Sequence, residues 1–197
     1  MRIYVVFAHP SKESFTQKVL ESFIRGLRDA GHSFEVGDLY AMNFKSELDL
    51  PEYKREIGLN PDAEVPPDVK AEQEKINKAD ALVFIYPVWW SDCPAKLKGW
   101  FDRVFTYGYA YQYVNGEHFT PKIQIEKALV LCSAGHTLEH LEEIGIAQSM
   151  RCIMLKDRLS GAGVKQARME ILGGTTGGED TLRQRHLTRV YQLGKTF

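Results

Sequence analysis

The sequence predicts a single α/β domain over residues 1–197, built on a doubly wound, five-stranded parallel sheet with helices on both faces. Five apolar runs of strand length recur along the chain, with helical patterns between them. This alternation is typical of a parallel sheet with right-handed crossover connections. Three of the runs are almost continuously hydrophobic, as expected when helices cover both faces of the sheet. We find no internal repeat or linker that would divide the chain.

The expected strands are residues 2–8, 33–39, 81–86, 128–133 and 166–172. The first, third and fourth are the almost continuous hydrophobic runs. We expect the spatial order 2-1-3-4-5, which is the flavodoxin-like order. Its switch point lies between the first and third strands, where α/β sheets bind their ligands.

Helical patterns fill most of the gaps between these strands. In the first gap, apolar residues recur at helical spacing and stop before Gly31; they are Phe15, Val19, Leu20, Phe23 and Leu27. Residues 67–78 are polar but compatible with a helix. A further helix would carry Leu97, Phe101, Val104 and Phe105 on one side, and a closing helix would carry Leu182, Val190 and Tyr191.

Two segments exceed what a minimal α/β unit needs. Residues 40–66 are long for a connection between a strand and a helix, and such loops usually cover a site or bind a partner. Residues 106–124 form an insertion before the fourth strand that is rich in rings: Tyr107, Tyr109, Tyr111, Tyr113, His118 and Phe119.

Composition excludes several classes of protein. A formal net charge of −1 shows no excess of basic residues of the kind that nucleic-acid binding needs. Three scattered cysteines, Cys93, Cys132 and Cys152, argue against a disulfide framework, and no metal-ligand spacing is present. The first residues lack the features of a signal peptide, and no run approaches the ~18 apolar residues of a membrane span. We therefore expect a cytoplasmic protein without membrane insertion.

The loop after the first strand offers groups that favour an anion. His9 supplies an imidazole, and Ser14 and Thr16 supply hydroxyls, where a helix N-terminus exposes its amides. Ser14 is the expected N-cap. From the residues alone, it remains open whether this loop binds an anion or only caps a helix. The glycine motifs of Rossmann dinucleotide sites and of P-loops are absent.

The loop after the third strand begins at Pro87 and Val88 and contains the adjacent tryptophans Trp89 and Trp90, followed by Ser91. Both indoles could fill the core. Two neighbouring tryptophans at the end of one strand cannot both point into the same core, however, so we expect at least one to line a cleft. An aromatic face there suggests a flat, conjugated ligand.

The loop after the fourth strand consists of Ser133, Ala134, Gly135 and His136. Small residues allow the backbone to approach a ligand and to donate hydrogen bonds to it. A competing glycine-rich stretch, residues 173–178, precedes Glu179 and Asp180, whose charges would repel an anion. We therefore interpret that stretch as a connector that caps the last helix. An anion site, an aromatic wall and backbone donors together indicate a flavin site.

These residues resemble a known family. The chain is similar to the NAD(P)H:quinone oxidoreductases of the flavodoxin-like superfamily, the group of the mammalian enzyme DT-diaphorase. The resemblance covers most of the first 135 residues and includes Ala8-His9-Pro10 with Ser14-Phe15, and residues 38–44. Its most specific part is the block of residues 94–105.

The resemblance implies roles for individual residues. His9, Ser14, Phe15 and Thr16 would hold the phosphate of the flavin. Pro87, Val88, Trp89, Trp90 and Ser91 would line its ring system, and Ser133, Ala134, Gly135 and His136 would bind its polar edge. Tyr111 and Tyr113 match tyrosines that line the substrate pocket, commonly from the partner subunit of a homodimer.

The sequence also departs from the family pattern. Ser91 stands where an aromatic residue is usual, which would leave a roomier or more polar cleft. Residues 133–136 replace a Thr-Thr-Gly-Gly loop, and the usual catalytic tyrosine and histidine beyond it have no clean equivalents. His136 or His140 could substitute for them. Because contacts to an adenine cannot be assigned from the resemblance, FMN and FAD are equally open as the cofactor.

The leading hypothesis is a flavin-dependent NAD(P)H:quinone oxidoreductase that works by ping-pong hydride transfer, with Tyr111, Tyr113 and His136 as catalytic candidates. One alternative is an ancillary flavoprotein of a potassium-efflux system that docks through residues 40–66. Another is a flavodoxin-like electron carrier, although the acidic bias of such carriers is missing. The sequence leaves open the natural acceptor and the choice between NADH and NADPH.

Overall fold

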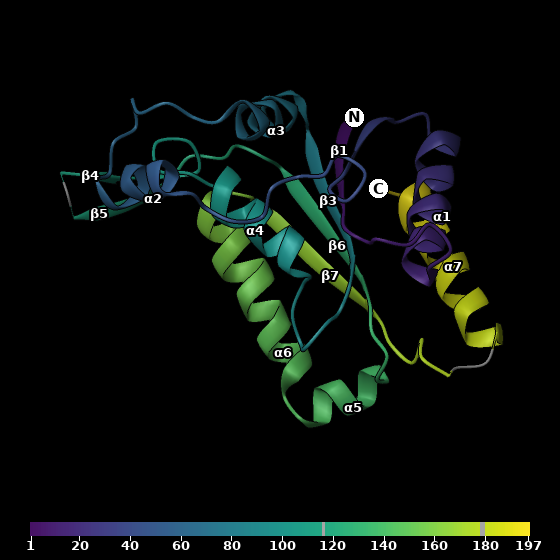
Figure 1. Ribbon diagram of the computed structural model, residues 1–197. Coiled ribbons are helices and arrows are strands. Elements are labelled where there is room, and N and C mark those ends of the chain that lie inside the picture. The colour runs from purple at the N-terminus through teal and green to yellow at the C-terminus, as the bar shows by residue number, and fades with distance from the viewer. Residues whose placement is uncertain (116, 178–179) are drawn as a thin grey trace.

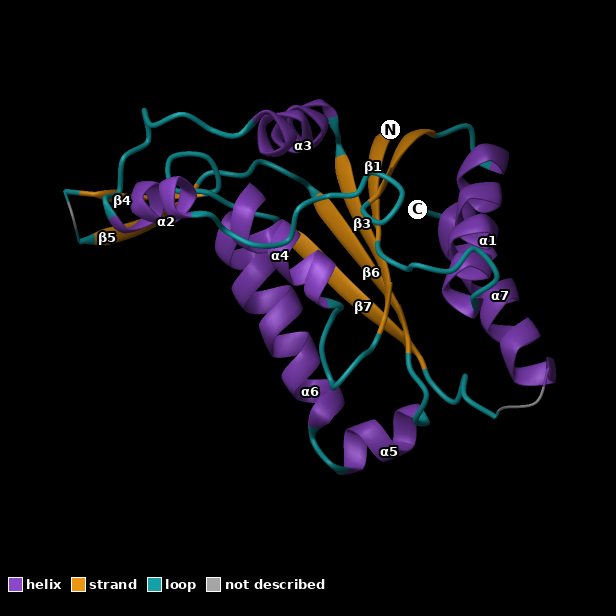
Figure 2. Ribbon diagram, viewed as in Figure 1, coloured by secondary structure: helices purple, strands orange, loops and turns teal. Residues whose placement is uncertain are grey.

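The computed structural model describes residues 1–115, 117–177 and 180–197. Its main sheet has five parallel strands in the order β2-β1-β3-β6-β7. The strands are β1 (Arg2–Phe7), β2 (Ser33–Asp38), β3 (Ala81–Pro87), β6 (Lys127–Ser133) and β7 (Gln166–Leu172). The predicted fold class and strand order are therefore confirmed, and every predicted strand lies within about two residues of its observed bounds (Figure 2).

The strands pair in a register that levels their carboxyl ends. Phe7 pairs with Ile85, while Pro87 pairs with Ser133, which in turn pairs with Leu172. The loops that follow β1, β3, β6 and β7 therefore begin at nearly the same edge of the sheet. In open α/β sheets this edge is where ligands bind.

Helices cover both faces of the sheet (Figure 1). One face packs against α1 (Phe15–Asp29) and α7 (Asp180–Lys195). The other packs against α3 (Pro67–Lys78), α4 (Ala95–Val104), α5 (Leu138–Glu143), α6 (Ile146–Arg151) and the π-helix η1 (Cys152–Ser160). The predicted helices are confirmed as α1, α3, α4 and α7. Residues 138–160 had no predicted helix.

Two glycines allow α1 and α7 to lie in direct backbone contact. A Cβ added at Gly26 would lie 2.3 Å from the Tyr191 carbonyl oxygen, and one at Gly194 would lie 2.4 Å from that of Phe23. The Ser22 hydroxyl also donates to the Leu187 carbonyl at 2.8 Å. This close crossing fixes the position of α1, whose N-terminus reaches the carboxyl edge of the sheet.

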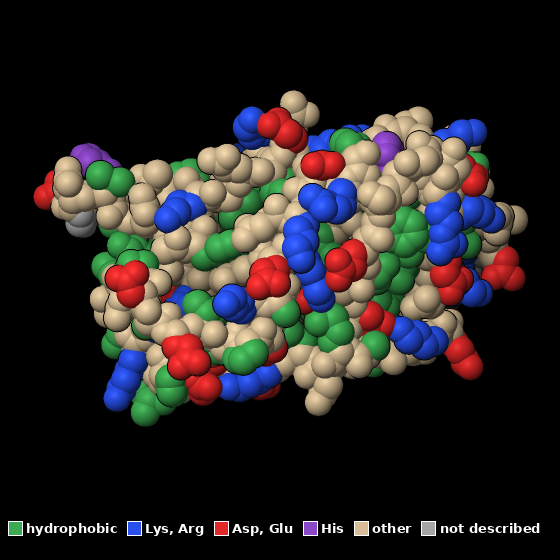
Figure 3. Space-filling view, turned by 90° about the horizontal axis from the view of Figure 1, so that it is seen from above, with side chains coloured by type: hydrophobic (Ala, Val, Ile, Leu, Met, Phe, Trp, Pro, Cys, Tyr) green, Lys and Arg blue, Asp and Glu red, His purple; other side chains and the backbone are tan. Residues whose placement is uncertain are grey.

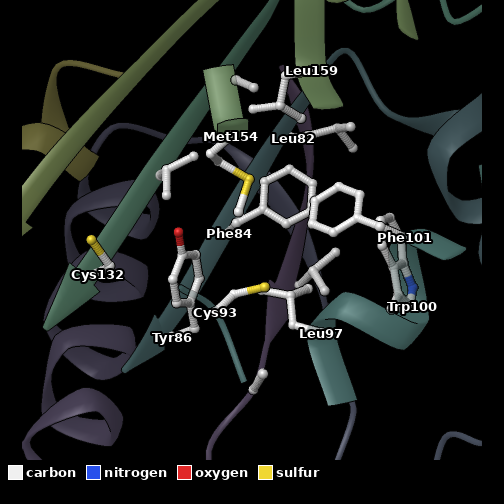
Figure 4. Packing of buried hydrophobic residues seen from close by; sticks show 14 of the residues in the cluster. Leu82, Phe84, Tyr86, Cys93, Leu97, Trp100, Phe101, Cys132, Met154 and Leu159 are labelled. Carbon is white, nitrogen blue, oxygen red and sulfur yellow. The ribbon is translucent and has the colours of Figure 1, made fainter. Parts of the chain in front are cut away.

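Aromatic and charged groups share the core on the opposite face. Phe84 of β3 packs against Trp100 and Phe101 of α4 (Figure 4). Beside them Glu72 is fully buried, yet its carboxylate accepts hydrogen bonds from the Tyr4 hydroxyl and from the Trp100 indole at 2.7 Å. Burial, followed by the Glu72 charge, raises the pKa of Tyr4, which stays protonated and donates. A buried carboxylate with several donors is tolerable, whereas an unpaired one is not.

The long segment 40–66 contains a helix that the sequence analysis did not predict, α2 (Leu50–Ile57). Asp49 and Glu52 form a capping box at its start, with a proline in its first turn. That motif is readable in the sequence and could have revealed the helix. The aromatic insertion likewise forms a two-stranded hairpin, β4 (Tyr111–Val114) with β5 (His118–Pro121).

Arg103 of α4 attaches this segment to the body of the domain. Its guanidinium is buried and donates to Glu52 at 2.7 Å and to the Lys45 carbonyl at 2.9 Å. It also forms a two-pronged bond with Asp68 of α3, at 2.5 and 3.0 Å. One side chain therefore connects α2, α3 and α4.

Within the described residues, no helix is long and apolar enough to cross a membrane.

Replacing Arg103 with methionine is expected to destabilise the protein strongly, because Glu52 would stay buried without its main partner. Breaking one side of a buried ion pair costs about 3–5 kcal/mol. Urea denaturation measures the change. The matched control is Lys98→Met on the same helix, since Lys98 pairs with Asp102 at the surface and such pairs contribute at most about 1 kcal/mol. Equal losses for the two variants would contradict this account of Arg103.

Candidate functional site

The loops at the carboxyl edge of the sheet enclose one pocket of about 590 Å³. Every residue predicted to bind a cofactor lines it. The lining residues are His9, Ser14, Phe15, Thr16, Pro87, Val88, Trp89, Trp90, Ser91, Ser133, Ala134, Gly135, His136, Leu141, Thr175 and Thr176. The structure thus brings together three loops that the sequence separates by more than 120 residues. Their role in binding stays a prediction.

The first wall of the pocket is the N-terminus of α1. Ser14 is the N-cap, as predicted, and its hydroxyl accepts the Gln17 amide at 3.0 Å. The amides of Phe15 and Thr16 lie in the first helical turn, where no earlier carbonyl is available to them. They can donate to a ligand, and the helix dipole adds partial positive charge. This wall suits a phosphate group.

His9 completes this wall. Its Nδ1 lies 3.0 Å from the Ser11 amide nitrogen, and its ring centroid lies 5.9 Å from that of Trp89. Partial burial lowers the pKa of His9 below its ordinary value, against the opposing effect of the Ser11 backbone. Nδ1 also lies 3.1 Å from the Ser11 carbonyl oxygen, so Ser11 occupies this nitrogen in either tautomer and Nε2 is the ring nitrogen left for a ligand.

The second wall is a tight turn of residues 89–92. The Trp89 amide donates to the Asp92 carbonyl at 3.0 Å, and the Asp92 amide donates back at 3.2 Å. The two central residues, Trp90 and Ser91, have φ values of +48° and +66°. Two positive φ values define a type I′ turn, which normally needs glycine or asparagine. The Trp90 side chain is fully exposed and that of Trp89 is 42% exposed. Neither indole enters the core, as expected for at least one of them.

Arg158 of η1 binds the Asp92 carboxylate at the end of this turn. Its guanidinium donates to both Asp92 carboxylate oxygens, at 2.9 and 3.1 Å, and its Nη1 lies 3.5 Å from the Cys93 sulfur. Partial burial would raise the pKa of Asp92, but bonds from Arg158 and from the Cys93 amide hold it below its usual value. Asp92 is therefore a carboxylate at neutral pH. Burial raises the pKa of Cys93 to about 12, so its thiol stays protonated.

The third wall joins the loop after β6 to the glycine-rich loop after β7. The Thr175 amide and hydroxyl donate to the Ala134 carbonyl at 3.0 and 2.9 Å, and the Gly174 amide donates to the His136 carbonyl at 2.8 Å. The Thr16 and Ser133 hydroxyls, 2.8 Å apart, connect this wall to α1.

The interpretation of residues 173–178 as a mere connector was incomplete, because Thr175 and Thr176 line the pocket. Gly178 and Glu179, which weighed in that interpretation, lie outside the described residues. The adjacency of β7 and β6 places the loop there, whatever charge follows it. The glycine-rich composition was the signal that could have identified it.

Tyr111 and Tyr113 are not among the described residues that line this pocket. They lie on the β4–β5 hairpin, which projects from the left end of the molecule in Figure 1, away from α5 and the ends of β6 and β7. Their rings pack with Phe119, at centroid distances of 5.5 Å for Tyr111 and 6.0 Å for Tyr113. Tyr113 and Phe119 are 38% and 51% exposed. The hairpin thus presents an apolar aromatic surface to solvent.

Comparison with known proteins agrees with this geometry. A family model described as the flavodoxin-like fold matches residues 1–193. The NAD(P)H:quinone oxidoreductase from Methanothermobacter marburgensis is 58% identical with a TM-score of 0.94, covering 100% of this chain and 96% of that one. The chain belongs to this family of flavodoxin-like quinone oxidoreductases. The family predicted from the sequence is therefore confirmed.

Relatives in this family differ in length. NAD(P)H dehydrogenase [quinone] 1 of Cavia porcellus is 35% identical over 166 residues, which are 78% of this chain and 60% of that protein. The chain spans about three fifths of the length of the first curated relatives it matches. An FMN-dependent NADH-azoreductase from Bacillus anthracis, solved with FMN, has a TM-score of 0.77 and 16% identity over 100% of this chain and 99% of that one. At that identity the likeness shows the fold alone.

The third wall yields a stability prediction. A Cβ added at Gly173 would lie 2.6 Å from the Leu138 amide nitrogen and 2.9 Å from the His136 carbonyl oxygen. Gly173→Ala should therefore force the two loops apart and cost about 1–3 kcal/mol in urea denaturation. The control is Gly161→Ala, whose Cβ would meet only the Lys156 carbonyl oxygen, at 3.5 Å. An unchanged stability in Gly173→Ala would show that this contact is loose.

Proposed function

We propose that this protein is a flavin-dependent NAD(P)H:quinone oxidoreductase in which residues 1–197 act as a single flavin-binding domain. The observation that carries the proposal is the pocket, where a helix N-terminus, an aromatic turn and a loop of small residues face one another. The 58% identity to the Methanothermobacter marburgensis enzyme supports it. The three cysteines, which are free thiols, suit a reducing compartment such as the cytoplasm.

The donors in the pocket fit a flavin. The amides of Phe15 and Thr16 and the Nε2 of His9 would hold the phosphate at the start of α1. The pocket volume lies within the range of roughly 300–1,000 Å³ that is common for small-molecule sites. When bound, a flavin accepts a hydride from a reduced nicotinamide and passes the electrons to an acceptor. FMN and FAD share the phosphate that this wall would recognise.

Residues of the other walls would position and polarise the ring system. Trp89 and Trp90 offer apolar faces on one side, and Ser91 offers a small polar group. The Ala134 amide already donates to the Leu172 carbonyl at 3.0 Å, so the Gly135 amide is the donor we assign to the polar edge of the ring. Donors aimed at developing negative charge are the usual means of stabilising it. His136 would donate a proton to the acceptor. The His140 ring packs beside it, with the two ring centroids 5.0 Å apart.

We further propose a homodimer in which Tyr111 and Tyr113 complete the acceptor site of the partner subunit. Both tyrosines belong to an exposed aromatic surface that lies away from the pocket of their own chain. Aromatic residues gathered in this way are enriched at interfaces. A planar quinone stacked on the flavin ring beside Trp90 would then meet the partner's tyrosines with its other face.

This proposal is preferred to that of a one-electron carrier. Lys and Arg side chains are interspersed with Asp and Glu side chains over the face seen in Figure 3. Steering of a charged redox partner needs a surface dominated by one sign. Small neutral acceptors need no such field.

The test is anaerobic reduction of the purified, flavin-loaded protein by NADH and by NADPH in a stopped-flow instrument, followed by reoxidation with a naphthoquinone. We expect the flavin to bleach with at least one nucleotide and to recover its absorbance on addition of the quinone. A protein that binds neither FMN nor FAD, or that neither nucleotide reduces, would disprove the proposal.

The dimer leads to a separate prediction. Phe119→Asp should place a charge in the aromatic surface of each subunit, so the variant should sediment as a monomer and lose most quinone reduction while still binding flavin. Ile144→Asp is the matched control, because Ile144 is 52% exposed against 51% for Phe119 but lies between α5 and α6. Sedimentation velocity and flavin titration measure both effects. A fully active wild-type monomer would contradict the shared site.

A further inference from the structure

The turn of residues 89–92 is held in a conformation that its own residues disfavour. Trp90 and Ser91 both lie in the left-handed region, at φ values of +48° and +66°. For residues with a side chain this region is disfavoured, because the Cβ atom comes too close to the following carbonyl oxygen. Such strain persists only where the surroundings impose it. The Trp90 side chain is fully exposed, so its packing within the chain does not impose this backbone geometry.

The surroundings that impose it come from η1. The Arg158 side chain is 10% exposed, and its two terminal nitrogens donate to the two Asp92 oxygens in a parallel fork. The same Asp92 carboxylate accepts the Cys93 amide at 2.7 Å. The guanidinium also lies over the Phe101 ring, 5.4 Å from its centroid. Planar, two-pronged bonding fixes direction as well as distance, which a single point charge does not.

Two buried residues of η1 set the position of this side chain. Met154 and Leu159 of η1 are buried in the core, where they lie near Phe84 and Leu82 (Figure 4). These two anchors set the rotation of the helix, and Arg158 then lies under the turn. π-helical turns are rare and occur frequently at functional sites.

We propose that Arg158 is a positioning residue for the acceptor side of the pocket. By holding Asp92 it keeps Trp90 and Ser91 in the type I′ geometry and so sets the wall beside which a flat acceptor stacks on the flavin ring. This inference rests on the proposed function. A purely structural ion pair, which only docks η1 onto the domain, is the rival account.

The geometry also couples two walls. One continuous stretch of chain, residues 133–160, contributes Ser133, Ala134, Gly135 and His136 to one wall and Arg158 to the support of the opposite wall. We therefore expect the distance between the second and third walls of the pocket to depend on the Arg158–Asp92 contact. Loss of the contact should loosen the turn without removing a pocket residue.

The test compares Arg158→Gln, Arg158→Lys and Asp92→Asn with the wild-type protein. The matched control is Arg151→Gln, because Arg151 lies in α6 immediately before η1 and pairs with Glu142 at 2.7 Å, away from the turn. Protein carrying flavin is reduced with dithionite under anaerobic conditions. It is then mixed either with a naphthoquinone, which must stack, or with ferricyanide, which accepts electrons without stacking.

We expect Arg158→Gln and Asp92→Asn to slow reoxidation by the quinone about tenfold and reoxidation by ferricyanide less than twofold. Arg158→Lys should fall between them and the wild type, because lysine keeps the charge without the fork. The visible circular dichroism of the bound flavin should change in the same order. Arg151→Gln should match the wild type in all three measurements. Asp92→Asn supplies the result if Arg158→Gln does not fold.

Wild-type circular dichroism and wild-type rates with both acceptors in the folded variants would overturn the inference, as would equal losses with both acceptors. Failure of the proposed function is distinguishable from either outcome. In that case the wild-type protein itself would bind no flavin, or neither nucleotide would reduce it.

Discussion

The register of the parallel strands is the constraint on which the rest of this molecule depends. Because Pro87, Ser133 and Leu172 end at one level, three loops start side by side without any further device. The α1 N-terminus reaches the same edge because Gly26 and Gly194 let α1 and α7 pack without intervening side chains. The pocket is thus a consequence of sheet geometry, and the loop residues only determine what it can bind.

Buried charges attach the irregular segments to this frame. Glu72 joins β1, α3 and α4, Arg103 joins α2 to α3 and α4, and Arg158 joins the tryptophan turn to η1. Each of the three has at least two hydrogen-bonding partners, which offset the cost of removing a charge from water. All three lie on the face of the sheet covered by α4. The opposite face, packed by α1 and α7, has an apolar core.

The sequence predicted most of the fold because apolar runs and helical spacing directly record which faces are buried. It predicted the pocket residues because parallel topology brings distant strand ends together. It missed residues 138–160 because α5 and α6 have only six residues each, too few for a clear helical period, and because π-helical spacing differs from 3.6. It missed Thr175 and Thr176 because charge near the loop outweighed the adjacency of β6 and β7, which only topology reveals.

Large aromatic side chains lie open to solvent both at the rim of the pocket and on the β4–β5 hairpin. The Trp90 indole stands fully exposed at the rim of the pocket, and Tyr113 and Phe119 stand exposed on the hairpin. Aromatic residues are enriched at protein interfaces. The strained turn argues that the exposure of Trp90 is imposed, since relaxing φ at +48° would let the indole move. In the proposed dimer the hairpin of one subunit would face the Trp90 of the other, so both surfaces would be covered only when the site is complete. Each chain would then form its own cofactor wall, whereas the acceptor site would be complete only in the dimer.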